Sequence, residues 1–217
     1  RRRLINQKSK GKMQNYKSKI KMVTDSAKQA SVVLVLVLST ASLCSAKYSG
    51  GTGEPNDPYR IATAEDLNDI GNHVEDYNKC FVMVNDINLA DYTGEEFNII
   101  GSYPDNPFAG VFDGNGHVVS NLTIAASDAD YVGLFGYVGY GGEIKNLGVE
   151  DPNLTGWDYV GGLVGENSGS LTCCYAIGGV EGGNIGGWSS VGGLVGENNG
   201  SVTSCYAAGT VGGVYFV

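Results

Sequence analysis

A 31-residue internal repeat narrows the possible folds of this chain more than any other pattern in it. Residues 160–167 and 191–198 carry the same eight letters, VGGLVGEN. When the alignment is extended to Val180 and Val211, its 21 positions hold only 5 differences. A weaker copy begins at Val132, which lies 28 residues before Val160. A unit of this length, present in successive copies, indicates a chain that stacks one supersecondary element on the next.

The letters inside the repeat favour strands over helices. Short apolar pieces such as GLVG, SLTCCY and SVTSCY are separated by Gly and Asn, and 33 of the 34 glycines lie after Ser49. Glycine at this density weakens helices and favours tight turns. Short strands bounded by turns are typical of a β-solenoid, whose coils stack at about 4.8 Å. We therefore predict an all-β solenoid in which like residues of successive copies lie side by side: Leu163 near Leu194, Val164 near Val195, and Tyr175 near Tyr206.

Nine small and apolar residues define the three copies of the repeat. They are Gly133, Leu134 and Gly136 in the first copy, Gly162, Leu163 and Gly165 in the second, and Gly193, Leu194 and Gly196 in the third. The full unit, GGLVGEN followed by GSVTSCYA, resembles the GLUG motif of bacterial extracellular proteins. Segments 58–67, 81–89 and 108–117 also resemble the opening coils of such domains, so the likeness covers about residues 54–215.

The resemblance implies a pectin-lyase-like, right-handed parallel β-helix. GLUG repeats occur in large surface proteins, including metallopeptidases that cleave immunoglobulin A, where they lie outside the catalytic domain. The motif is more specific for fold than for function. The likeness therefore implies a surface location and leaves the activity to be argued from the residues themselves.

Residues 1–46 have the order of a basic leader followed by a secretory signal peptide. Ten of the 14 Lys and Arg residues lie before Lys47, and an apolar run follows at residues 31–38. This run is short for a membrane span, which takes about 20 residues. Small residues at 44–46 place the expected cleavage after Ala46, with an uncleaved anchor or a lipoprotein site at Cys44 as alternatives. We expect a mature part that is secreted or at the cell surface and that does not insert into a membrane.

The mature part divides into a lead-in segment, residues 47–79, and the β-helix, residues 80–217. Thr63 and Asp66 have the spacing of a capping box, and Leu67, Ile70 and Val74 fall on one helical face. We expect this short helix to cover the open apolar end of the solenoid. The apolar residues 214–217 do not resemble a polar cap, so we expect the chain to be a fragment of a longer protein.

Charge restricts the partners of the mature part. From Lys47 onward the chain has 4 basic and 22 acidic residues, a formal net charge of −18. A mature part with this charge repels nucleic acids and anionic membranes and attracts cations and basic molecules. We therefore expect an extracellular protein or a glycan as partner, and no nucleic acid.

Catalytic motifs are sparse in this sequence. The His-Glu-x-x-His motif of zinc peptidases is missing. We predict that His73 is a surface residue of the cap helix and that His117 closes a turn from Asp113, whose Asp-Gly and Asn-Gly pairs supply positive φ angles. A catalytic pairing of Asp113 with His117 is the alternative. Arg60 is the only arginine after residue 46, which argues against lyase chemistry on acidic sugars. We expect no catalytic residue and no cofactor.

Two pairs of residues occupy equivalent positions in the repeat, one pair of glutamates and one pair of cysteines. Glu166 and Glu197 lie 31 residues apart and are interpreted as solvated turn residues, with calcium binding as the alternative. Cys174 and Cys205 align as well, and stacked coils would bring their Cα atoms within disulfide range. Both a disulfide and a ladder of free thiols fit this pair. We expect no resident metal.

These patterns support three hypotheses about function. The first is a non-catalytic surface repeat module that serves as an adhesin, stalk or binding scaffold. The second is an accessory segment of a larger surface peptidase, and the third is a β-helix enzyme that acts on polysaccharides. Fold alone does not license the third hypothesis. We therefore predict that the protein is not an enzyme.

Overall fold

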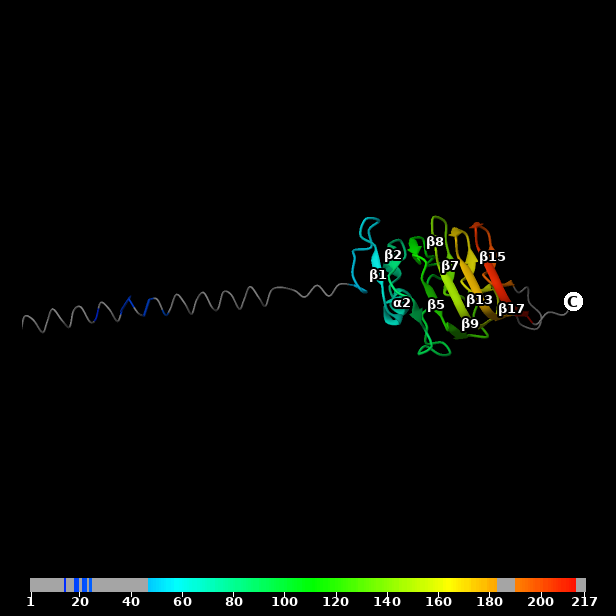
Figure 1. Ribbon diagram of the computed structural model, residues 1–217, viewed down its shortest axis with the longest axis horizontal. Helices are drawn as coiled ribbons and strands as arrows, with labels where there is room; N and C mark the ends of the chain where they lie inside the picture. Colours follow the sequence, from blue (N-terminus) through cyan, green and yellow to red (C-terminus); the bar gives the residue numbers. More distant parts are fainter. Residues whose placement is uncertain are drawn as a thin grey trace, which may run out of the picture. The chain divides into compact units, whose positions relative to one another are not determined.

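The structure is a computed structural model that describes residues 47–182 and 190–213, together with Gln14, Ser18, Lys19, Lys21, Met22 and Thr24 (Figure 1). The chain divides into two compact units, Arg1–Ser45 and Ala46–Val217, and the second unit carries the fold. The predicted signal peptide and the apolar residues 214–217 lie outside the described residues. Within the described residues, no helix is long and apolar enough to cross a bilayer.

Residues 47–182 and 190–213 form short strands joined by tight turns, with one α-helix and one 3-10 helix among them. The elements are β1 (Tyr59–Ile61), α2 (Ala64–Ile70), η1 (Val74–Asp76), β2 (Cys80–Met83), β3 (Ile87–Asn88), β4 (Val111–Asp113), β5 (Val118–Ser120), β6 (Thr123–Ala125), β7 (Phe135–Val138), β8 (Glu143–Lys145), β9 (Gly148–Gly156), β10 (Val160–Gly161), β11 (Val164–Asn167), β12 (Ser170–Thr172), β13 (Tyr175–Gly182), β14 (Val191–Gly192), β15 (Val195–Asn198), β16 (Ser201–Thr203) and β17 (Tyr206–Gly213).

These strands form a right-handed parallel β-helix, in agreement with the solenoid that the repeat predicts and with the fold that the family resemblance implies. Sheet 1 has the order β1-β2-β4-β8-β12-β16, sheet 2 the order β3-β5-β9-β13-β17, and sheet 3 the order β7-β11-β15. Strands β10 and β14 pair separately, and β6 pairs with β9. Each later coil places one strand in each sheet before the chain climbs to the next, so the coils follow one another from β1 to β17 in Figure 1. Strand β1 pairs with β2 and so adds a rung within the expected lead-in segment.

The register confirms that like residues of the repeat meet. Val164 pairs with Val195, and Tyr175 pairs with Tyr206. The backbone N–H of Leu163 donates to the carbonyl oxygen of Leu194 at 2.9 Å. The weaker copy follows the same register, because Val132 forms a parallel β-bridge with Val160. Offsets of 31 and 28 residues therefore each correspond to one coil.

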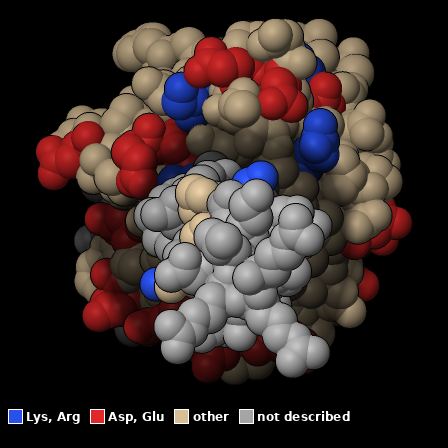
Figure 2. All heavy atoms as spheres, turned by 90° about the vertical axis from the view of Figure 1, so that its left-hand side faces the viewer, with Lys and Arg blue, Asp and Glu red and all other residues tan. Residues whose placement is uncertain are grey.

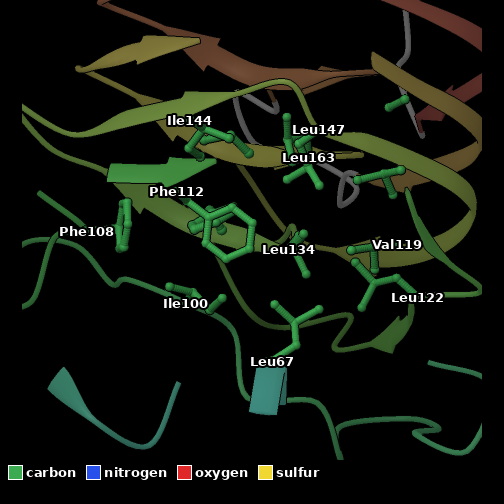
Figure 3. Close-up of a cluster of buried hydrophobic side chains, with 14 of the residues drawn as sticks. Leu67, Ile100, Phe108, Phe112, Val119, Leu122, Leu134, Ile144, Leu147 and Leu163 are labelled. Atoms are coloured by element: carbon green, nitrogen blue, oxygen red, sulfur yellow. The ribbon is translucent and has the colours of Figure 1, made fainter. Parts of the chain in front are cut away.

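The core is a stack of apolar side chains inside the coil. In sheet 1, Phe81, Phe112, Ile144 and Leu171 follow one another in register and are all almost fully buried. Residues beside them on each strand alternate to the outer face, because side chains along a strand point to opposite sides. Figure 3 shows this interior, where leucines from several coils meet the phenylalanine rings. Each such side chain contributes about 1.5–3 kcal/mol when it is fully buried.

The predicted cap helix is present and begins as expected. The Thr63 side chain accepts from the Asp66 backbone N–H, and the Asp66 carboxylate accepts from the Thr63 N–H, which completes the capping box. Leu67 is fully buried and reaches the core cluster (Figure 3).

Two details of the cap prediction were wrong. The helix ends at Ile70 with Gly71 as its C-cap, so Val74 starts the 3-10 helix η1 and is 50% exposed instead of joining the apolar face. His73 lies between the two helices instead of on the cap helix, and its ring contacts Asp69 and Glu75. The helical spacing was extended one turn too far, past a glycine.

Candidate functional site

A row of three stacked tyrosine rings lies where the chain enters sheet 3. The rings of Tyr131 and Tyr159 lie 4.6 Å apart between centroids and are almost parallel, at 4°. Tyr103, which is 51% exposed, stacks on Tyr131 at 5.2 Å. Tyr131 and Tyr159 directly precede Val132 and Val160, which bridge between coils, so the stacking of coils aligns the rings.

The glycines of the repeat position this tyrosine row. A Cβ atom added at Gly136 would lie 2.7 Å from the backbone oxygen of Tyr131, and one added at Gly165 would lie 2.7 Å from that of Tyr159. Such distances are too short for a real side chain, so only glycine lets the tyrosine backbone lie against β7 and β11. Gly136 and Gly165, the last glycines of GLFG and GLVG in their copies of the repeat, are therefore spacing residues for the row.

A second row, made of one tyrosine and two carboxylates, runs beside the first. Tyr137, Glu166 and Glu197 are in register in strands β7, β11 and β15. The Tyr137 ring lies 5.2 Å from that of Tyr103 and 6.4 Å from that of Tyr131, between centroids. We call Tyr103, Tyr131, Tyr159, Glu166 and Glu197 together the tyrosine–carboxylate face.

An asparagine bridges the two stacked carboxylates. The Nδ2 group of Asn199 donates to Oε1 of Glu166 at 3.2 Å and to Oε1 of Glu197 at 3.0 Å. Ser190 Oγ donates to the other oxygen of Glu197 at 3.3 Å. Glu166 is only 8% exposed, and burial raises the pKa of its carboxyl, with a further rise from Glu197 that the bond from Asn199 opposes. Glu166 is therefore a buried acid and not the solvated turn residue that we expected.

The tyrosine–carboxylate face is negatively charged without a compensating cation. Burial raises the pKa of Tyr159, and four carboxylates raise it further: Asp158, Glu197, Glu166 and Asp130. The four Lys and Arg residues of the β-helix unit pair with other acids: Lys47 with Asp76, Arg60 with Asp57, Lys79 with Glu54 and Lys145 with Glu143. The sequence after Lys145 holds no Lys, Arg or His. Figure 2, which views the second unit from its N-terminal end, likewise shows many acidic side chains and few basic ones.

Each histidine pairs with acidic side chains near it: His73 with Asp69 and Glu75, and His117 with Asp86. Residues 113–117 form the predicted turn between β4 and β5, with φ angles of 53° at Asn115 and 80° at Gly116. The Nδ1 atom of His117 lies 3.0 Å from Asp86 Oδ1, so His117 pairs with the preceding coil and not with Asp113. Asp113 instead accepts from the backbone of Asn115 at 2.8 Å. The alternative pairing of Asp113 with His117 is therefore wrong.

The aligned cysteines lie together as free thiols. The backbone N–H of Cys174 donates to Sγ of Cys205 at 3.2 Å. Cys174 is buried, and burial raises the pKa of its thiol to about 12. Cys173 is exposed, and its φ angle of 55° matches those of the equivalent turn residues Asn146 and Ser204. Among the described residues, no group of three or more His, Cys, Asp or Glu side chains is arranged to hold a metal ion.

The tyrosine row was missed in the sequence, although a signal for it was present. Tyr-Val-Gly precedes the core of the repeat at Tyr131 and at Tyr159, but the third copy has Ser190 in that place. Tyr103 comes from a loop outside the repeat, so its stacking on Tyr131 depends on tertiary structure alone.

Comparisons with known proteins agree with this architecture. A family model described as the GLUG motif matches residues 189–212. Halomucin of Haloquadratum walsbyi is 33% identical over 133 residues, which are 59% of this chain and 2% of halomucin. A protein of Evansella cellulosilytica, provisionally named a Gly-rich membrane protein, is 34% identical over 153 residues, 64% of this chain and 17% of that protein. The chain thus spans only a small part of these relatives.

One solved structure shares the fold. It is the crystal structure of a protein from Bacteroides ovatus provisionally named an immunoglobulin A1 protease, with a TM-score of 0.61 and 21% identity. The superposition covers 75% of this chain and 50% of that chain. At this identity the likeness shows the β-helix and carries no further residue roles.

Proposed function

We propose that this GLUG-motif β-helix protein is a non-catalytic module of a secreted or cell-surface protein that binds a basic extracellular partner through its tyrosine–carboxylate face. The observation that carries the proposal is the row of stacked tyrosines beside two in-register carboxylates. Tyrosine offers a large, rigid contact area with a polar tip, which is why it is enriched in protein interfaces. Uncompensated carboxylates beside it attract positive charge and raise association rates.

The solenoid itself suits a scaffold. Every coil repeats the same backbone ladder, so the outer side chains are held at fixed spacing by a core that does not depend on them. Rigid presentation lowers the entropy lost on binding. One relative is named halomucin and the other a Gly-rich membrane protein, and these names support a surface setting for this chain.

An accessory segment of a larger surface peptidase is the second candidate. It is supported by the fold shared with the protein named as an immunoglobulin A1 protease, of which this chain covers half. In that setting the same face would hold the substrate or the cell surface while another domain performs the cleavage. The two candidates thus differ in whether a peptidase domain accompanies the β-helix. In both, the tyrosine–carboxylate face binds a partner.

The binding face can be tested with the full chain and immobilised poly-L-lysine as the probe. We expect binding that weakens as salt rises, because screening shortens the reach of surface charges. The double variant Tyr131→Ala/Tyr159→Ala and the single variant Glu197→Gln should each bind several-fold more weakly. Tyr140→Ala is the matched control, since Tyr140 is 83% exposed and lies outside the face.

Two results would contradict the proposal. Unchanged binding of the double variant would show that the tyrosine–carboxylate face is not the binding site. Turnover of any polymer in a parallel hydrolysis screen of polysaccharides and proteins would show that the module is catalytic. Circular dichroism of each variant separates loss of binding from loss of the fold.

A further inference from the structure

A cavity of about 300 Å³ lies on the outer side of sheet 1, away from the tyrosine–carboxylate face. It is lined by Pro55, Pro58, Cys80, Phe81, Val82, Val111, Asp113 and Lys145. Its floor, its roof and its polar end each follow from a different part of the chain.

Strand alternation forms the floor. Because Phe81 and Phe112 fill the core, the residues beside them on β2 and β4 face outward. Cys80 is in register with Val111, and Val82 is in register with Asp113. The floor is therefore mainly apolar over two coils and becomes polar at Asp113.

The roof is a loop that internal bonds hold in place. The Asp57 backbone N–H donates to the Glu54 oxygen at 2.9 Å, which closes a tight turn around Pro55. Two contacts tie this turn to the coil: the ion pair of Lys79 with Glu54 at 2.9 Å, and the bond from the Cys80 N–H to the Gly53 oxygen at 2.9 Å. The cavity is thus formed before any ligand arrives, which lowers the cost of binding.

The polar end carries both a donor and an acceptor. Asp113 is in register with Lys145, whose ammonium lies 2.9 Å from a Glu143 oxygen. The Asp113 Oδ1 atom accepts from Asn115 and from Asn146 Nδ2 at 3.0 Å, which fixes the carboxylate. An anionic ligand would be repelled by Asp113 and Glu143, and a cationic ligand by Lys145. A neutral group with adjacent hydroxyls can donate to Asp113 and accept from Lys145.

We propose that this cavity binds one ring of a neutral hexose polymer. The C–H face of a pyranose ring is apolar and would lie on Val82 and Val111, while its hydroxyl edge would meet Asp113 and Lys145. A volume of about 300 Å³ is at the lower end of the range for ligand pockets, which suits one ring better than a long stretch of polymer. The site is separate from the tyrosine–carboxylate face, so either proposal can fail without the other.

The test uses the full chain and three neutral hexamers of different linkage: cellohexaose, laminarihexaose and maltohexaose. Hexamers of galacturonic acid and of glucosamine serve as the anionic and cationic counterparts. Calorimetry measures affinity, and labelling of Cys80 with N-ethylmaleimide reports on the cavity itself. The labelling background is Cys44→Ser/Cys173→Ser/Cys205→Ser, in which Cys174 stays buried.

We expect at least one neutral hexamer to bind more tightly than both charged hexamers and to slow Cys80 labelling several-fold. Lys145→Met, which keeps the length of the side chain, should weaken that binding about tenfold. Val111→Trp should abolish it by filling the cavity. Thr172→Val is the control, because Thr172 continues the same outward column on the next coil without lining the cavity.

Three outcomes would overturn the proposal. The first is no binding of any neutral hexamer at about 10 mM, a concentration that reveals even weak millimolar sites. The second is a preference for either charged hexamer. The third is unchanged affinity in Lys145→Met, a variant whose outward side chain leaves the core intact and so remains informative if Val111→Trp does not fold.

Discussion

The last glycine of each repeat unit, Gly136 or Gly165, connects the packing of single atoms to the outer face of the protein. At Gly165 an added Cβ would lie 2.6 Å from the Gly136 oxygen and 2.7 Å from the Tyr159 oxygen, both of them backbone atoms that cannot rotate away. We expect Gly165→Ala to destabilise the protein by about 1–3 kcal/mol, the usual cost of overpacking. Urea denaturation measures the change.

Gly179→Ala is the matched control for this prediction. The nearest atom to a Cβ added at Gly179 is a side-chain oxygen at 3.6 Å, an ordinary contact. Its stability should change by no more than about 0.5 kcal/mol, as for most surface substitutions. Equal effects at the two glycines would contradict the view that Gly165 is a spacing residue.

Glu166 makes stability depend on pH in the direction opposite to most carboxylates. Burial raises the pKa of Glu166 in the folded protein above its ordinary value of 4.5. The folded state therefore holds the proton more tightly than the unfolded state. This contribution to stability is complete below about pH 4.5 and is lost as pH rises through the folded pKa.

Replacing Glu166 should remove this pH dependence. As pH increases above 4.5, the unfolding free energy of the wild type should fall relative to that of Glu166→Gln. The difference between the two proteins should therefore shift toward the variant. Urea titrations at a series of pH values measure the difference. Glu181→Gln, at an exposed strand position, is the control and should show no such trend. A difference that does not vary with pH would contradict the assignment of a raised pKa to Glu166.

At the scale of strands, the pairing of β13 with β17 brings Cys174 and Cys205, which directly precede them, together as free thiols. Cys174 is 1% exposed and its pKa is raised to about 12 by burial, so at pH 8 it is almost entirely an unreactive thiol. We expect iodoacetamide to modify Cys173 in the native protein and to leave Cys174 unmodified. Peptide mass spectrometry locates the label.

Unfolding without a reductant then separates the two forms of the cysteine pair. Free thiols at Cys174 and Cys205 would both become labelled in urea, which is the result we expect. A disulfide would leave both unlabelled until a reductant is added. Cys173→Ser serves as the control, because it removes the exposed thiol and with it any exchange between neighbouring sulfurs.

Sequence reasoning recovered the elements that depend on local pattern. The register of Val164 with Val195 follows from two identical octapeptides, and the start of α2 follows from the capping box at Thr63. Contacts between segments that lie far apart in the sequence could not be predicted. Tyr103 reaches the tyrosine row from outside the repeat, and Pro55 reaches sheet 1 from a loop before the first strand. Such contacts leave no periodic trace in the chain.

For the whole molecule, the stacking of coils implies that the stability lost on a core substitution depends on which coil carries it. Leu134, Leu163 and Leu194 occupy equivalent places in three successive coils, and Leu163 has a described coil on either side. In a solenoid each coil contacts only its neighbours, so stability is a sum of nearest-neighbour terms. Shortening the Leu163 side chain should therefore weaken the packing of its coil against both neighbouring coils.

We expect Leu163→Ala to lower the unfolding free energy by about 2–5 kcal/mol, as for other buried leucines. Leu194→Ala should cost less, because Leu194 is already 8% exposed in the last described coil. Hydrogen exchange distinguishes the two: Leu194→Ala should speed exchange mainly within residues 190–213, whereas Leu163→Ala should speed it in the coils on both sides. If both variants raised exchange equally along the whole unit, the coils would behave as one cooperative block, and nearest-neighbour coupling would be the wrong description of this β-helix.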